Sequence, residues 1–155
     1  MQQYEPRLAG QRDLAAVQGI VRDAYMPYVG QIGRKPGPLL DDYETLINAR
    51  LVTVVDVDDT VRGVLVLKPE TGAMLLDNVA VAPSAQGLGL GRSLMQHAEQ
   101  QARGLGYGRI RLYTHEAMTR NIEYYTRTGY VETHRAEERG LKRVFMVKSL
   151  TSEAR

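Results

Sequence analysis

The sequence predicts an α/β (α+β) protein with a mixed central sheet and the element order βααβββαβαββ. Three observations predict this class. Segments of helical periodicity alternate with runs rich in β-branched residues, short polar turns join three consecutive strands, and a glycine-rich stretch connects the last of these strands to a helix. A chain of 155 residues fits one domain that can fold alone, so residues 1–155 are expected to form a single domain.

Two helices are predicted in the first third of the chain. Apolar side chains recur at helical spacing over residues 11–26. The Gly/Pro cluster from Gly30 to Pro38 then predicts a loop inside the domain. After this loop, Asp41 and Asp42 stand where an N-cap and a first-turn carboxylate would support a short second helix.

Three strands follow, at 51–57, 61–68 and 73–81. The turns between them, at 58–59 and 69–72, are short and polar, which favours an antiparallel meander.

The rest of the chain alternates helices and strands. A helix with an apolar stripe follows the glycines and ends near Gly104 and Gly106. Because the next strand follows a crossover helix, it should pair in parallel with the strand that ends at Val81. The remaining elements are this strand at 109–114, a short helix at 121–128 and a hairpin of strands at 130–138 and 141–150.

The stretch QGLGLGRS, from Gln86 to Ser93, predicts an anion-binding site. Backbone N–H groups of a glycine loop and a first helical turn point one way, the helix dipole adds positive potential, and missing Cβ atoms let phosphate oxygens approach. The spacing does not fit the dinucleotide pattern G-x-G-x-x-G, because Arg92 stands at the last glycine. It does not fit the P-loop pattern either, since Gln86 replaces the first glycine.

This segment resembles motif A of the GNAT superfamily of acyl-CoA N-acyltransferases, [Q/R]-x-x-G-x-[G/A], with Gln86, Gly89 and Gly91 at the matching positions. The sequence VAVAP at 79–83 and the pattern N-x-x-YY-x-x-x-GY at 121–130 reinforce the resemblance, which extends along nearly the whole chain. It implies a GNAT fold in which the strand at 78–81 carries a bulge and splays from its neighbour, opening a cleft between the fourth and fifth strands.

The resemblance also implies acetyl-CoA as co-substrate. Its pantetheine arm would pair with strand backbone in the cleft, and its pyrophosphate would lie on the glycine loop. For Asn121, a role as a helix N-cap explains the residue about as well as a contact with the coenzyme. The coenzyme-binding residues implied in this way are Val79, Ala80, Val81, Gln86, Gly87, Leu88, Gly89, Leu90, Gly91, Arg92, Ser93 and Asn121.

Acetyl transfer to an amine needs a neutral amine, a donor for the oxyanion and a donor for the departing thiolate. By similarity to the family, a backbone N–H near Val81 would serve the oxyanion and Tyr125 would donate to sulfur. The family often uses a carboxylate on the central strand as base, acting through water, and Asp77 is the nearest candidate. An ordinary solvated strand residue explains Asp77 equally well. His115 and Glu116 are rival bases, and water alone is a further alternative.

Composition and charge exclude several classes of protein. The net charge of +2, with basic and acidic residues interleaved, gives no extended surface for nucleic acid. There is no signal peptide, no apolar run near the ~20 residues that span a bilayer, and no cysteine, so a cytoplasmic protein without membrane contact is expected. His97 and His134 lack partners at ligand spacing, and no metal is expected.

Two functions are compatible with these observations. The first is an N-acetyltransferase that works by direct transfer in a ternary complex, which suits a chain without a cysteine nucleophile. The second is a non-catalytic module that binds acyl-CoA as a sensor or as a regulator of a partner. The acceptor amine is left open between small molecules and proteins or peptides. Basic residues in the loop 30–40 and the last hairpin would suit an acceptor with a carboxylate or phosphate, but solvated charges at a sheet edge explain them slightly better. The late strands also offer an edge for a homodimer.

Overall fold

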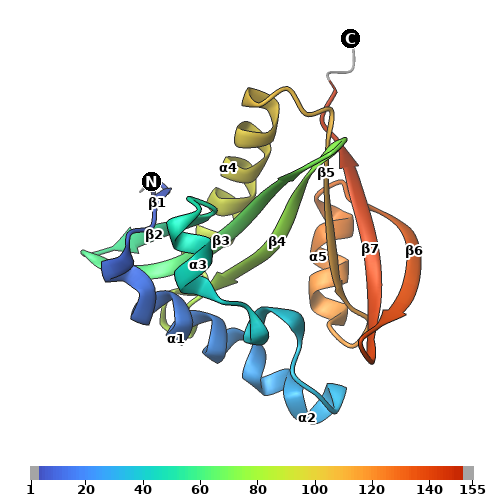
Figure 1. Ribbon diagram of the computed structural model, residues 1–155, viewed down its shortest axis with the longest axis horizontal. Coiled ribbons are helices and arrows are strands. Elements are labelled where there is room, and N and C mark those ends of the chain that lie inside the picture. Colours follow the sequence, from blue (N-terminus) through green and yellow to red (C-terminus); the bar gives the residue numbers. More distant parts are fainter. Residues whose placement is uncertain (1–3, 152–155) are drawn as a thin grey trace.

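The computed structural model describes residues 4–151, which form a seven-stranded mixed sheet with helices packed against it (Figure 1). The α-helices are α1 (Leu14–Tyr25), α2 (Val29–Ile32), α3 (Tyr43–Asn48), α4 (Leu90–Gly104) and α5 (Thr119–Arg127). The strands are β1 (Arg7–Leu8), β2 (Val52–Val57), β3 (Thr60–Glu70), β4 (Ala73–Val81), β5 (Arg109–His115), β6 (Val131–Glu138) and β7 (Leu141–Ser149).

The strands lie in the order β1-β2-β3-β4-β5-β7-β6. β2, β3 and β4 form the predicted antiparallel meander. β4 and β5 pair in parallel across the helix α4, as expected for a crossover connection, and β7 lies between β5 and β6 with antiparallel pairing on both sides. The predicted α/β class with a mixed sheet is therefore confirmed.

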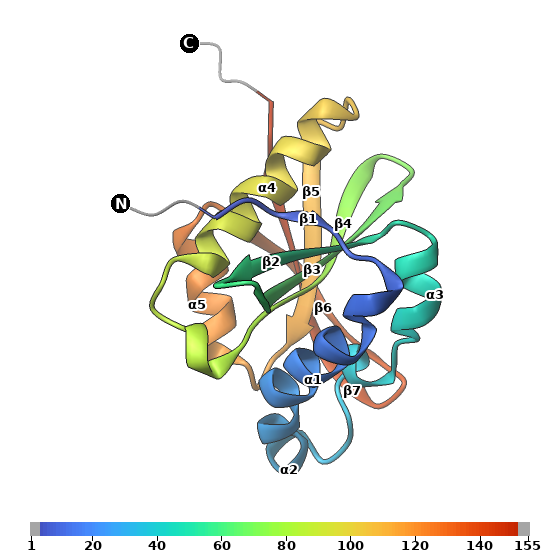
Figure 2. The same ribbon diagram turned by 90° about the vertical axis from the view of Figure 1, so that its left-hand side faces the viewer.

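Helices cover both faces of the sheet (Figure 2), and each face has its own apolar core. Leu65 and Leu67 of β3 belong to the core that contains the inward faces of α4 and α5. Val64 and Val66, which alternate with them, belong to the core beneath α1 and α3. A strand buried on both faces needs apolar residues at successive positions, which explains the continuous apolar run at the centre of β3.

The segment predicted as a loop from Gly30 to Pro38 contains more structure than expected. The short helix α2 ends at Gly33, whose φ of 88° gives the left-handed C-cap that glycine adopts most readily. A 3₁₀ turn follows at Gly37–Leu40. α2 thus adds an element to the predicted order. Over residues 4–151, each helix is too short or too polar to cross a lipid bilayer.

Candidate active site

β4 and β5 separate after a short parallel pairing. Met74, Leu75 and Leu76 pair with Ile110 to Leu112, and the pairing ends there (Figure 1). Beyond this point β5 continues its pairing with β7 as far as His115. The second half of β4 therefore has an open edge, and the cleft expected between the fourth and fifth strands is present.

The expected β-bulge lies at Asp77. Val66 of β3 faces Asn78 and Leu67 faces Leu76, so Asp77 is the extra residue of β4. Asp77 and Asn78 are both buried, with 9% and 2% of their surface exposed. Beyond the bulge, Ala82 donates its N–H to the carbonyl of Arg62 at 2.7 Å. Because N–H directions alternate along a strand, the N–H of Val81 points away from β3, into the cleft.

The space between the diverging strands forms a narrow cavity, the inner pocket, of ≈ 40 Å³. Val79 of β4, His115 of β5, and Asn121 and Tyr125 of α5 line it, together with Asp77. Residues 36–38, in the chain between α2 and α3, line it too. Segments far apart in the sequence therefore meet at this pocket.

A buried hydrogen-bond chain fixes the bulged strand to the helices beneath it. The Tyr25 hydroxyl donates to Asn78 Oδ1 at 2.8 Å, and Asn78 Nδ2 donates to Tyr43 Oη at 2.9 Å. The Tyr43 hydroxyl donates to the Pro38 carbonyl at 2.6 Å. Burial raises the pKa of both tyrosines, so these hydroxyls keep their protons. This chain was missed from the sequence, because its four members come from four separate elements.

The glycine loop follows β4 and leads into α4. Gly87 and Gly89 have φ values of 88° and 87°, in the left-handed region that favours glycine. Gly91 is different, since it lies in the first turn of α4 without a positive φ. A Cβ there would meet its nearest neighbour, Val81 Cγ2, at 4.0 Å. The fold itself has room for a side chain at Gly91, so this glycine leaves space beside the helix N-terminus.

The residues from Gln86 to Ser93 differ in what they can offer a ligand. Gln86, Leu88 and Arg92 are exposed, whereas Leu90 is 1% exposed and packs in the core. The first three N–H groups of α4, those of Leu90 to Arg92, have no acceptor inside the helix. The N–H of Ser93 bonds to the Gly89 carbonyl at 3.1 Å, and its hydroxyl donates to the Tyr4 carbonyl at 3.2 Å. Ser93 therefore already uses both of its donors.

Tyr125 is 7% exposed and lines the inner pocket. Its ring lies 5.8 Å from the rings of Tyr124 and Tyr130, measured between centroids. Burial raises the pKa of the Tyr125 phenol above its ordinary value of 10.0. The phenol thus keeps its proton and can donate a hydrogen bond into the pocket, but it yields the proton less readily than an exposed tyrosine.

Asp77 has three polar neighbours. The Tyr113 hydroxyl donates to Asp77 Oδ1 at 3.1 Å, and Lys68 Nζ lies 3.3 Å from Asp77 Oδ2. The third neighbour is Asp41, which lies near enough to feel the charge of Asp77; burial, followed by that charge, raises the pKa of Asp41 to about 6. The prediction that Asp41 supports a helix start is wrong, because Asp42 is the N-cap of α3 and accepts the Thr45 N–H at 3.2 Å.

The rival bases differ in position. His115 lines the inner pocket, and its Nδ1 accepts the Ala117 N–H at 3.0 Å, while burial lowers the pKa of the ring and keeps it neutral. Glu116 is 42% exposed at its side chain and lies 3.9 Å from Arg135 in an ion pair. Asn121 does not cap α5, which begins at Thr119 after the N-cap residue Met118. Its amide lies 3.7 Å from Met118 Sδ.

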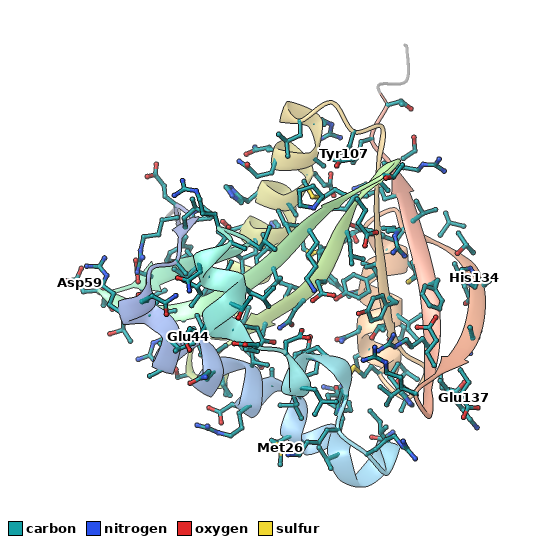
Figure 3. All side chains as sticks on the ribbon, viewed as in Figure 1. Met26, Glu44, Asp59, Tyr107, His134 and Glu137 are labelled. Carbon is teal, nitrogen blue, oxygen red and sulfur yellow. The ribbon has the colours of Figure 1, made fainter. Side chains whose placement is uncertain are left out.

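The two other histidines lie away from this cleft. His97 is partly buried on α4, and burial lowers its pKa. His134 stacks on Phe145 with 4.4 Å between ring centroids, and Figure 3 shows it with Glu137 on β6, at the outer edge of the sheet. The described part of the chain has no cluster of three or more His, Asp or Glu side chains suited to a metal ion. The absence of a metal stays a prediction.

The fold is characterised by two parallel strands, β4 and β5, that diverge beside a glycine loop and the N-terminus of α4. Its solved relatives include the ribosomal-protein-S18-alanine N-acetyltransferase of Escherichia coli, with a TM-score of 0.75 and 16% identity over 98% of this chain and 97% of that one. A putative acetyltransferase of Salmonella typhimurium, solved with acetyl-CoA, has a TM-score of 0.73 and 20% identity over 99% of this chain and 98% of that one. The PaiA N-acetyltransferase of Thermoplasma acidophilum, solved with coenzyme A, has a TM-score of 0.73 and 17% identity over 96% of this chain and 99% of that one.

The family follows from the sequence match. The chain belongs to the Acetyltransferase (GNAT) family, whose model matches residues 17–130. The comparison with curated proteins gives no match. At the identities above, the solved relatives establish the fold, and the family match establishes the acetyltransferase class.

Proposed function

We propose that this chain, acting as one cytoplasmic domain, is an N-acetyltransferase that moves the acetyl group of acetyl-CoA directly to a primary amine in a ternary complex. The observation that carries the proposal is the open edge of β4, which leads through a 3₁₀ turn at Pro83–Ala85 to the glycine loop and to the N–H groups at the start of α4 that have no acceptor in the helix. Solved relatives with acetyl-CoA or coenzyme A bound support the choice of co-substrate.

The coenzyme would lie along this edge. Its pyrophosphate would accept hydrogen bonds from the N–H groups of Leu90 to Arg92, and the helix dipole would favour its negative charge there. Because Gly91 has no side chain, the phosphate oxygens could approach the helix closely. Its pantetheine arm would pair with the backbone of residues 79–81, as a further strand does. Asn121 and Tyr125 then lie on the side where the thioester would enter the inner pocket.

The reaction needs one bond made and one broken. The amine nitrogen attacks the thioester carbonyl carbon, the C–N bond forms, and the oxyanion accepts the Val81 N–H. The C–S bond then breaks, and the thiolate leaves while it accepts a hydrogen bond from Tyr125. The raised pKa of Tyr125 makes hydrogen-bond donation to sulfur easier than full proton transfer. The attacking nitrogen becomes positively charged and gives up one proton, and the thiolate takes up this proton and departs as free thiol.

Asp77 is the base that the geometry supports best. It lines the inner pocket, and Asp41 lies near it, so an ammonium group that enters the pocket can pass its proton to Asp77. His115 lines the pocket as well, but one ring nitrogen already accepts a backbone N–H. Glu116 does not line the inner pocket.

The test is a thiol-release assay with acetyl-CoA across pooled amines, with mass spectrometry of the product. We expect acetyl-CoA to raise the melting temperature and at least one amine to gain an acetyl group in step with thiol release. A clear thermal shift by acetyl-CoA with no acetylated product across a broad panel would instead indicate an acyl-CoA sensor. No thermal shift would contradict both functions.

A further inference from the structure

A second, wider cavity adjoins the inner pocket. This cavity, the outer basin, has a volume of ≈ 870 Å³ against ≈ 40 Å³ for the inner pocket. Both are lined by Asp77, Tyr113 and Arg143, so the basin opens toward the carboxylate proposed as base. The chain between α2 and α3 and the turn between β6 and β7 form its rim. A molecule in the basin could therefore present one end to the inner pocket.

The charges of the basin are unequally compensated. Lys68 is paired with Asp77, and Arg143 Nη1 bonds to Glu138 Oε1 at 2.6 Å. The rim cations Arg34, Lys35 and Arg139 form no ion pair with any residue from 4 to 151. Three uncompensated cations close together repel one another, and an anion between them would relieve that repulsion.

Arg34 is held in place at this rim. Its Nη1 donates to the Arg139 carbonyl at 3.1 Å, across 105 residues of sequence. Its guanidinium covers Gly140, where an added Cβ would lie 2.5 Å from Arg34 Cζ. A guanidinium that is already oriented loses less conformational freedom when it binds a carboxylate or phosphate through its remaining N–H groups. The rim is therefore a prepared surface, unlike freely solvated charges.

The floor of the basin carries the opposite charge. Two carboxyl groups, those of Asp41 and Asp77, lie there against one cation, Lys68, which is paired with Asp77, and the Tyr113 hydroxyl donates to Asp77. An ammonium group is the natural ligand of two adjacent carboxyl groups, because it can donate to both and reduce their repulsion. Cations at the rim and carboxylates at the floor together fit a molecule with an amine at one end and an anion at the other.

We infer that the acceptor is a small amine that also carries an anionic group, a carboxylate or a phosphate, with the amine between Asp41 and Asp77 and the anion at Arg34, Lys35 and Arg139. This inference rests on the proposed N-acetyltransferase function. It explains why the basic residues of two distant segments meet at one rim beside the proposed base.

The first test compares matched acceptors. Amino carboxylates of increasing chain length are assayed beside their primary amides and the corresponding aminoalkyl phosphates, with the acetyl-CoA thiol-release assay. We expect kcat/KM for the best carboxylate or phosphate to exceed that of the matched neutral amide by at least roughly tenfold. A preference for the carboxylate or for the phosphate identifies which anion the rim binds.

The second test uses charge-neutral variants of the rim. Arg34→Gln and Arg139→Gln should each raise KM for the anionic acceptor by about tenfold, with kcat and the KM for acetyl-CoA nearly unchanged. They should leave the KM for the neutral amide unchanged. Arg12→Gln is the control, because Arg12 is an exposed arginine that does not line the basin. All three variants should keep the wild-type melting temperature within a few degrees.

The possible outcomes distinguish a failure of this inference from a failure of the proposed N-acetyltransferase function. Equal or better turnover of neutral amides, polyamines or peptide amines would overturn the inference and leave an N-acetyltransferase in place. Rim variants that lose activity equally toward anionic and neutral acceptors would overturn it as well. Acetyl-CoA binding with no turnover of any amine would overturn the proposed function, and the inference with it.

Discussion

At the scale of single residues, Tyr125 and Tyr124 offer a matched pair on α5. Tyr125 lines the inner pocket, whereas Tyr124 is half-buried outside its lining. We expect Tyr125→Phe to lower kcat by about 10- to 100-fold, because the thiolate loses its donor, and to change the KM for acetyl-CoA little. Tyr124→Phe should keep kcat within about twofold. Steady-state kinetics with a good acceptor checks this, and an unchanged kcat in Tyr125→Phe would remove Tyr125 from the mechanism.

Asp41 makes a second prediction at this scale. Burial, followed by the charge of Asp77, raises its pKa from 3.8 to about 6, although Lys68 and Arg143 oppose this shift. Since the folded chain binds this proton more tightly, the stability that the group contributes is complete below pH 3.8 and is lost as pH rises through about 6. Asp41→Asn, which imitates the neutral acid, should therefore raise the melting temperature more at about pH 7.5 than at about pH 4.5.

The control for Asp41 is Asp23→Asn, at an exposed carboxyl group of α1. Its melting temperature should follow that of the wild type at both pH values. A constant difference between Asp41→Asn and the wild type across this pH window would show that Asp41 does not titrate with a raised pKa.

At the scale of elements, two glycines of α4 distinguish what the fold requires from what a bound coenzyme would require. Gly91 and Gly104 both lie in α4 without a positive φ and with space for a side chain. Either change to Ala should stabilise the helix by up to about 1 kcal/mol. Gly91→Ala should also weaken acetyl-CoA binding at least about tenfold, since its methyl group would stand where a phosphate oxygen approaches. Gly104→Ala should leave binding unchanged. Calorimetry of binding and thermal unfolding checks both, and equal affinity in the two variants would contradict a coenzyme at this helix.

Elements were predictable from the sequence where their signal is local. The strands of the meander, the glycine loop and α5 follow from periodicity and turn residues, so they were placed to within a few residues. α2 was not predicted, because its single turn depends on the cap at Gly33 more than on any apolar pattern. The side of the strand on which Asp77 lies was also undecidable, since the bulge that fixes it changes the alternation of the strand.

At the scale of the whole molecule, the cleft joins parts of the chain that the sequence keeps far apart. The glycine loop and Tyr125 carry recognisable local patterns, and both were named in advance. Asp41 carries no such pattern, and Arg34 was expected only as one of several basic residues that could suit an anionic acceptor. They reach the site through contacts with Asp77 and Arg139, which exist only after the sheet, α3 and the last hairpin have packed together. Such contacts cannot be read from spacing along the chain.

The contact between Arg34 and the β6–β7 turn gives a prediction at this scale. Gly140 and Gly72 are turn glycines with φ values of 78° and 86°, so changing either to Ala should cost about 1 kcal/mol of stability. A Cβ at residue 140 would also meet Arg34, whereas at residue 72 it would meet nothing within 4 Å. Because the contacted atoms are the flexible end of Arg34, this side chain should move at little further cost.

Gly140→Ala and Gly72→Ala should therefore be equally stable and differ in catalysis. Displacing Arg34 from the rim should raise the KM for an anionic acceptor by several-fold, on the order of 1 kcal/mol, in Gly140→Ala alone. The KM for acetyl-CoA should stay constant in both, because the glycine loop lies elsewhere in the fold. Thermal unfolding and steady-state kinetics on the two variants test this. An equal KM for the acceptor in both variants would mean that the contact between Arg34 and the β6–β7 turn does not contribute to the acceptor site.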